Sequence, residues 1–147
     1  MASIPDPLTR RELLHLRQKR PVDHAGIGQA YLAQGRHSEA LDFLERIQDA
    51  AERARLLGAV RDQAIGLGDA FVLARVHGLL PLERVHWERA FAAAKAAGKP
   101  RFALRLARQL GDEAEVARLE LELGLRVPEP VAPPAAPTDP VAEPGPS

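Results

Sequence analysis

The amino-acid sequence predicts an all-α protein of about seven to eight helices, arranged as antiparallel hairpins stacked in a short solenoid. Apolar residues recur at intervals of three and four between regularly placed glycines, which is typical of amphipathic helices. No segment combines clean alternation with β-branched enrichment, so no strand is expected. Eight of the 13 prolines lie in residues 127–147, so the helical region is expected to end before them.

Glycines and capping residues mark the expected helix boundaries. Glycine readily adopts the left-handed conformation that closes a helix, and the expected C-caps are Gly35, Gly68, Gly78, Gly98, Gly111 and Gly124. The expected N-caps, whose side chains accept from free backbone N–H groups, are Thr9, Asp23, Ser38, Asp69 and Asp112. Pro81 and Pro100 suit the first helical turn, where a missing N–H is not needed.

Each expected helix carries one apolar face. In the first helix this face is expected to consist of Leu8, Leu13 and Leu16. The faces that follow in chain order are Ile27, Ala30, Tyr31; Ala40, Phe43, Leu44, Ile47; Leu57, Val60, Ala64, Leu67; Trp87, Ala90, Phe91, Ala94; Phe102, Leu106, Leu110; and Val116, Leu119, Leu123. The patterns predict helices over residues 8–20, 24–34, 38–48, 50–67, 70–77, 82–97, 100–110 and 113–123.

Short connections force neighbouring helices to run antiparallel, and alanine-rich faces let their axes approach closely. The sequence therefore predicts one helical domain over residues 1–125, flexible at 1–7, and a tail over 126–147. Residues 127–147 hold three acids and no base, so the tail is expected to be disordered. Its Pro-x-x-Pro spacings suit a polyproline ligand, but a spacer is favoured because no cation flanks them.

Composition narrows the class of protein. Lysine plus arginine and aspartate plus glutamate both number 20, so no global field favours nucleic acid or anionic lipid. Cysteine is absent, which excludes disulfides and thiol chemistry. The first 20 residues do not form a secretory signal, and no run of 18 apolar residues exists, so cytoplasmic residence is expected. Arginine-rich and alanine-rich usage indicates a bacterial source.

The turn glycines also define a repeat. Gly35 and Gly68 are 33 residues apart, and Gly68 and Gly98 are 30 apart, a period typical of helical solenoids. The unit around Gly28, Tyr31, Gly35 and Ala40 resembles the tetratricopeptide repeat, which places a small residue, an aromatic, a turn glycine and an alanine at these positions. Gly28 and Ala40 would sit where two helices touch, and Tyr31 would fill the groove between them.

The expected arrangement of helices resembles the family over residues 24–110, whereas the family's characteristic residues are matched only over residues 24–47. Trp87, Gly98 and Ala103 match the family pattern in the third unit, where Phe91 replaces a small residue. The second unit keeps little beyond Gly68, and the helix over 113–123 would be a polar cap. The resemblance implies binding of a peptide or protein on a concave face, by a non-catalytic adaptor or scaffold in a larger assembly.

Catalysis is not expected, and no cofactor or metal is implied. Apart from the tail, the hydroxyl-bearing Thr9, Ser38 and Tyr31 already have capping or packing roles, which leaves no activated nucleophile. Glu-x-x-His occurs at Glu12–His15 and Glu83–His86, but a di-iron site would need further inward-facing glutamates. Surface polar pairs are the favoured interpretation. His24, His37 and His77 show no metal-ligand spacing.

Two surfaces are candidates for binding. The concave face would be lined by the helices over 24–34, 50–67 and 82–97, and its candidate groove residues are Gln34, Arg61, Glu88 and Lys95. The alternative is a helical nucleic-acid binder whose basic residues are Arg10, Arg11, Arg17, Arg20, Arg101, Arg105 and Arg108. Phe102 is expected on the face opposite the stripe of Arg101, Arg105 and Arg108, so no aromatic residue is expected among these arginines, which weakens single-strand stacking. A homo-oligomer formed through an uncapped end is a further option.

Overall fold

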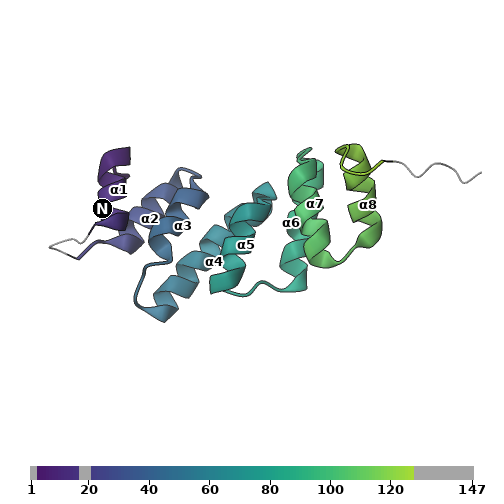
Figure 1. Ribbon diagram of the computed structural model, residues 1–147. Helices are drawn as coiled ribbons and strands as arrows, with labels where there is room; N and C mark the ends of the chain where they lie inside the picture. The colour runs from purple at the N-terminus through teal and green to yellow at the C-terminus, as the bar shows by residue number, and fades with distance from the viewer. Residues whose placement is uncertain (1–2, 17–20, 128–147) are drawn as a thin grey trace, which may run out of the picture.

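The computed structural model describes residues 3–16 and 21–127, and within them the chain forms eight α-helices and no strand (Figure 1). The expected all-α class is confirmed. The helices are α1 (Pro7–His15), α2 (His24–Ala33), α3 (His37–Leu44), α4 (Ala50–Leu67), α5 (Ala70–Leu79), α6 (Arg84–Ala96), α7 (Pro100–Leu110) and α8 (Glu113–Glu122). None of these helices is both long and apolar enough to cross a bilayer. The tail prediction falls on residues outside the described part.

Three helices begin elsewhere than expected. Asp6, not Thr9, caps α1, because its carboxylate accepts from both the backbone N–H and the hydroxyl of Thr9, at 3.0 and 2.8 Å. Ser38 lies inside α3, which begins one residue earlier without a side-chain cap. Pro81 precedes α6, because that helix begins at Arg84.

Helix α3 ends at Leu44 instead of residue 48, and α5 ends at Leu79 instead of residue 77. The remaining cap predictions hold with one exception. Asp23, Asp69 and Asp112 each accept a hydrogen bond from a first-turn N–H. Gly35, Gly68, Gly98, Gly111 and Gly124 all have φ between 63° and 72°, the left-handed conformation expected of them. Gly78 is the exception, since it lies within α5.

The first helix differs in length and in its buried face. It ends at His15, and the backbone of Leu16 is already extended. The prediction of an unbroken helix over residues 8–20 is therefore wrong at Leu16. Leu14 is its buried residue, whereas Leu8 and Leu16 are exposed, so the expected apolar face was misplaced. Leu14 packs into the core, and its carbonyl accepts from Arg46, just beyond α3, at 2.7 Å.

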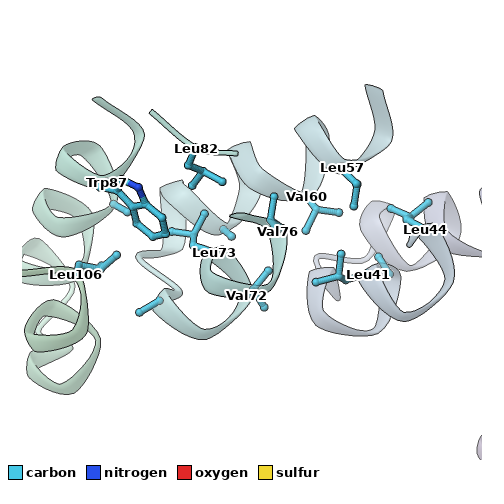
Figure 2. Packing of buried hydrophobic residues seen from close by; sticks show 14 of the residues in the cluster. Leu41, Leu44, Leu57, Val60, Val72, Leu73, Val76, Leu82, Trp87 and Leu106 are labelled. Atoms are coloured by element: carbon cyan, nitrogen blue, oxygen red, sulfur yellow. The ribbon is translucent and has the colours of Figure 1, made fainter. Parts of the chain in front are cut away.

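The helices stand in a row, with each pair lying beside the next (Figure 1). Helices α2 to α5 pack consecutively, as do α6 to α8. Alternate helices also touch: α2 with α4, α4 with α6, α3 with α5, and α5 with α7. One apolar core runs through the row from Leu14 to Leu119, and Figure 2 shows part of it, including residues from Leu41 to Leu106. The predicted apolar seam shared by successive helices is therefore present.

The α2–α3 contact depends on small residues. A Cβ on Gly28 would lie 2.3 Å from Leu44 Cδ2 and 3.4 Å from the Ala40 carbonyl oxygen, so only glycine allows this approach. Tyr31 is fully buried and stacks on Phe43 with ring centroids 5.7 Å apart. The packing roles expected of Gly28, Tyr31 and Ala40 are thus confirmed.

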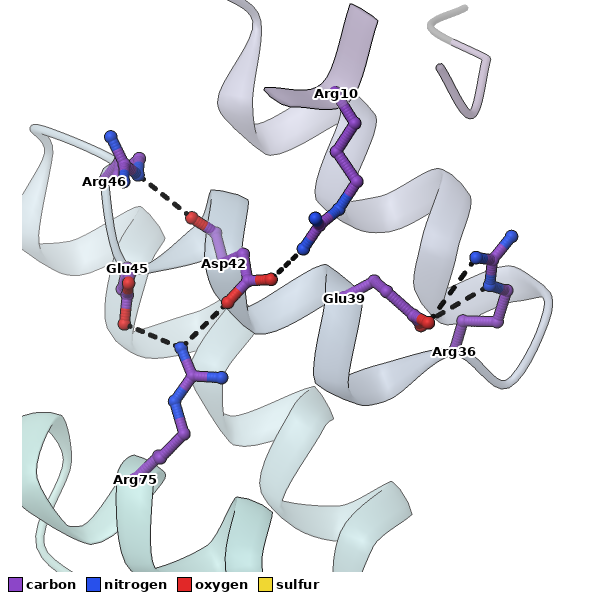
Figure 3. Close-up of polar contacts among 7 residues, drawn as sticks. All are labelled: Arg10, Arg36, Glu39, Asp42, Glu45, Arg46 and Arg75. Atoms are coloured by element: carbon purple, nitrogen blue, oxygen red, sulfur yellow. Dashed lines mark hydrogen bonds and ion pairs between the residues drawn. The ribbon is translucent and has the colours of Figure 1, made fainter. Parts of the chain in front are cut away.

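Polar contacts between neighbouring pairs recur at one sequence separation. Arg46 donates to the Leu14 carbonyl, Lys99 to the Leu67 carbonyl at 2.8 Å, and His37 Nε2 lies 2.7 Å from Asp69 Oδ2, each across 32 residues. Around Asp42, Arg10 approaches from α1, across 32 residues, and Arg75 from α5, across 33 (Figure 3). This separation matches the glycine period.

Candidate partner-binding groove

The four residues expected to line the concave face each have separate surroundings in the structure. Gln34 is exposed just beyond α2. Arg61 pairs with the neighbouring Asp62 at 2.9 Å, and Glu88 with Arg84 at 3.5 Å, both within their own helix. Lys95 pairs with Glu115 of α8 at 3.3 Å. These charges are therefore engaged locally, and no ion pair or hydrogen bond joins any two of the four.

The expected basic patch is divided by the fold. Arg10 forms an ion pair with Asp42 and is half-buried, so it serves the α1–α3 contact. Arg11 is exposed, whereas Arg17 and Arg20 lie outside the described residues. The arginines of α7 lie together at the other end of the row. The N-terminal and C-terminal basic residues accordingly make no common surface.

A groove lies between α5 and α7 at the level of Trp87. Its floor consists of the buried Trp87 of α6 and Leu106 of α7, which both point toward the core (Figure 2). The remaining lining residues are Ala70 and Ala74 on the α5 side and Arg105, Arg108 and Gln109 on the α7 side. The groove thus combines an apolar floor with a cationic rim.

An aromatic residue joins the arginines at this rim. Phe71 of α5 is 58% exposed, and the Arg105 guanidinium lies 4.0 Å from the centre of its ring. Phe71 also meets the edge of Phe102, with centroids 5.7 Å apart. The sequence pattern missed this contact because Phe71 is far from the arginines along the chain. Their separation is close to one repeat period, the signal that would have found it.

The arginines along α7 differ in whether a carboxylate neutralises their positive charge. Arg108 Nη2 pairs with Glu120 Oε2 at 3.2 Å, and Glu120 also accepts from Arg126 at 2.9 Å. Arg101 and Arg105 are exposed and have no carboxylate partner among residues 3–16 and 21–127. The uncompensated positive charge therefore lies at Arg101 and Arg105.

The histidines have structural partners. His86 Nδ1 accepts the Glu83 backbone N–H at 2.9 Å, so this Glu-x-x-His pair caps the start of α6. His77 Nδ1 accepts from the Leu82 N–H at 2.9 Å, and its ring meets the edge of Trp87. In the described part of the chain, no group of three His, Asp or Glu side chains is placed to hold a metal ion. Glu12 and His15 are exposed on α1.

Comparison with protein-family models, with curated proteins and with solved structures finds no match for this chain.

Proposed function

We propose that this chain is a non-catalytic protein-interaction module of the tetratricopeptide-like type, an adaptor or scaffold in a bacterial assembly. Its binding site is the α5–α7 groove. The partner is an acidic protein segment with an apolar anchor. The observation that carries this proposal is the pairing of a Trp87–Leu106 floor with the uncompensated Arg105 at the rim.

The repeat contacts support the solenoid part of the proposal. Polar contacts 32 or 33 residues apart link α1 to α3, α3 to α5, and α4 to the hairpin of α6 and α7. Left-handed glycines close the helices at 35, 68 and 98. Repeat proteins place equivalent residues one period apart and stack them through nearest-neighbour contacts. The same features occur here at the period of the glycines.

The groove's chemistry supports the choice of partner. Interfaces gain most of their affinity from apolar or aromatic anchors in pockets, surrounded by a polar rim. An apolar side chain from a partner fits over Trp87 and Leu106. Carboxylates beside that anchor would form charge-assisted hydrogen bonds with Arg105 and Arg101. An acidic segment with one or two apolar residues meets both requirements.

A helical nucleic-acid binder is the second candidate, because Phe71 beneath Arg105 resembles a stacking platform. Two uncompensated arginines would neutralise about two phosphates, which gives a salt slope of only about −1.4 on a single strand. The protein as a whole has equal numbers of acidic and basic residues. Protein binding is therefore the favoured function.

Fluorescence anisotropy with three labelled probes tests the proposal. The probes are an acidic peptide containing leucines, the same peptide with serines in place of leucines, and an oligothymidylate. The groove variant is Arg101→Gln/Arg105→Gln. Its matched control, Arg55→Gln/Arg89→Gln, removes the same charge from exposed arginines of α4 and α6.

We expect the leucine-containing peptide to bind best and the groove variant to weaken it about 30-fold, since two charge-assisted contacts of about 1 kcal/mol each are lost. The control variant should bind normally. Trp87, the only tryptophan, should change its emission on binding because it lines the groove. An equal loss of affinity for the leucine-containing peptide in both variants would show unspecific charge attraction and refute the proposed site. Tighter binding of the oligothymidylate would favour the nucleic-acid function.

A further inference from the structure

Helices α1 and α8 stand at the two ends of the row (Figure 1), and exposed apolar side chains lie at both ends. On α1 and its C-cap, Leu8 is 65% exposed and Leu16 61%. At the other end, Leu121 of α8 is 43% exposed and Leu125 57%. Exposed apolar groups grouped on one face mark interaction sites more often than isolated ones do.

The polar contacts show where α1 stands in the repeat. Arg10 of α1 reaches Asp42 of α3 across 32 residues, and Arg75 of α5 reaches the same carboxylate across 33 (Figure 3). Thus α1 lies one repeat period before α3 in the row, and α5 lies one period after it. Helix α1 stands in the series α1, α3, α5, α7, the second helices of the hairpins. Among the described residues, no first helix pairs with it.

The position of α8 is the complementary one. It packs on α7, and its Glu115 pairs with Lys95 of α6 at 3.3 Å. It therefore continues the series α2, α4, α6, the first helices of the hairpins. Helix α7 follows α6 and forms a hairpin with it, but among the described residues no helix follows α8 to form a hairpin in the same way. Within residues 3–16 and 21–127, α1 is thus a second helix without its first, and α8 is a first helix without its second.

We infer that two copies of this chain join head to tail, with α8 of one copy and α1 of the next completing a hairpin. Leu121 and Leu125 would meet Leu8 and Leu16 of the second copy. This contact continues the apolar core from one copy into the next. It uses the ends of the row, so it leaves the α5–α7 groove open.

The charges of the two helices favour this pairing over its alternatives. Between Pro7 and His15, α1 has two arginines against one glutamate, and α8 has four glutamates against one arginine. Arg11 is exposed without an ion pair among the described residues, and so is Glu113. Arg10 is already paired with Asp42, and the other three glutamates of α8 are paired with cations of this chain. Arg11 and Glu113 are therefore the charges that would attract α8 to α1, whereas two copies of α8 would bring like charges together.

A contact between different surfaces of identical chains has a defined consequence. It is heterologous, so it leaves one free end on each copy and grows with concentration rather than stopping at a dimer. Each joint buries two short helix faces, which corresponds to a weak interface. The average mass should therefore rise steadily with protein concentration.

Sedimentation equilibrium with two blocking variants tests the inference. Leu8→Glu places a charge on the α1 face, and Leu121→Glu places one on the α8 face. Either variant alone should remain monomeric, because one side of every joint is blocked. An equimolar mixture should form dimers that grow no further, since it restores one intact α8–α1 joint. Leu79→Glu, which changes another exposed leucine at the end of α5, is the matched control and should assemble like the unmodified chain.

Circular dichroism on each variant establishes that it folds. A mixture that stays monomeric while the unmodified chain assembles would overturn the head-to-tail joint. So would dimers of either single variant, because they would come from contacts between identical faces. An unmodified chain that stays monomeric up to about 1 mM would also overturn it, since even a weak joint populates there.

Discussion

Replacing Gly68 by alanine should destabilise the protein far more than the same change at Gly35. Both glycines end a helix with similar left-handed backbones, φ 63° and 71°. Their surroundings differ. A Cβ on Gly68 would lie 2.6 Å from the backbone N of Ala94 and 2.7 Å from its Cα, whereas a Cβ on Gly35 meets nothing within 4 Å. The pair therefore separates backbone strain from helix packing.

The expected magnitudes follow from these contacts. A left-handed alanine costs about 1–2 kcal/mol, partly offset by about 0.4–1 kcal/mol because alanine restricts the unfolded chain. Gly35→Ala should thus lower the free energy of unfolding by about 1 kcal/mol. At Gly68 the neighbouring atoms are backbone, which cannot rotate away, so α4 and α6 must separate. Overpacking of this kind adds about 1–3 kcal/mol, for a total of about 3 kcal/mol.

Urea unfolding measures the difference with two probes. Helix content by circular dichroism follows the whole array, and Trp87 emission follows the α6–α7 hairpin, because repeat proteins need not unfold in one step. We expect Gly68→Ala to shift both transitions by about three times as much as Gly35→Ala. Equal shifts for the two variants would show that α4 and α6 do not approach closely at Gly68, and the packing account would be wrong.

Two further predictions concern a histidine and a helix cap. Burial, together with the nearby Arg46, lowers the pKa of His24 below 6.5, while Asp23 partly opposes this. The unfolded state therefore binds the proton more readily, so the free energy of unfolding should rise with pH between the lowered pKa and 6.5. His24→Gln should flatten this rise in urea titrations, and an NMR titration should place the ring pKa below 6.5. Asp112→Ala removes the N-cap of α8 and should lower the free energy of unfolding by about 1 kcal/mol, whereas the adjacent Glu113→Ala loses only a few tenths from the helix dipole.

Local signals in the sequence were enough to locate the helices. A left-handed glycine or a capping aspartate acts within one turn, so Gly68 and Asp69 identify the α4–α5 boundary from neighbouring residues alone. The misplaced starts have local causes as well. At α1, Asp6 and Thr9 are both competent caps, and the aspartate prevails because its carboxylate accepts two hydrogen bonds from Thr9.

The candidate site could not be located in the same way, because its parts come from different helices. The arginines of α7 are visible as a stripe in the sequence, but Phe71 joins them only through the α5–α7 contact. Conversely, the sequence pattern places Arg10 among the free surface charges, but the fold pairs it with Asp42, which is 32 residues away. Which charges remain free depends on tertiary contacts that periodicity alone does not specify.

The groove follows from an imbalance in packing across the α6 helix. On the side facing α4, the fully buried Ala90 and Ala94 let the helices approach until Gly68 touches backbone. On the side facing α5 and α7, the buried Trp87 lies at the base of the groove, and the small Ala70 and Ala74 line one side of it. The groove that we propose as the binding site thus lies where the large Trp87 and the small Ala70 and Ala74 meet, a combination that comes from two different helices and is not visible as a local sequence pattern.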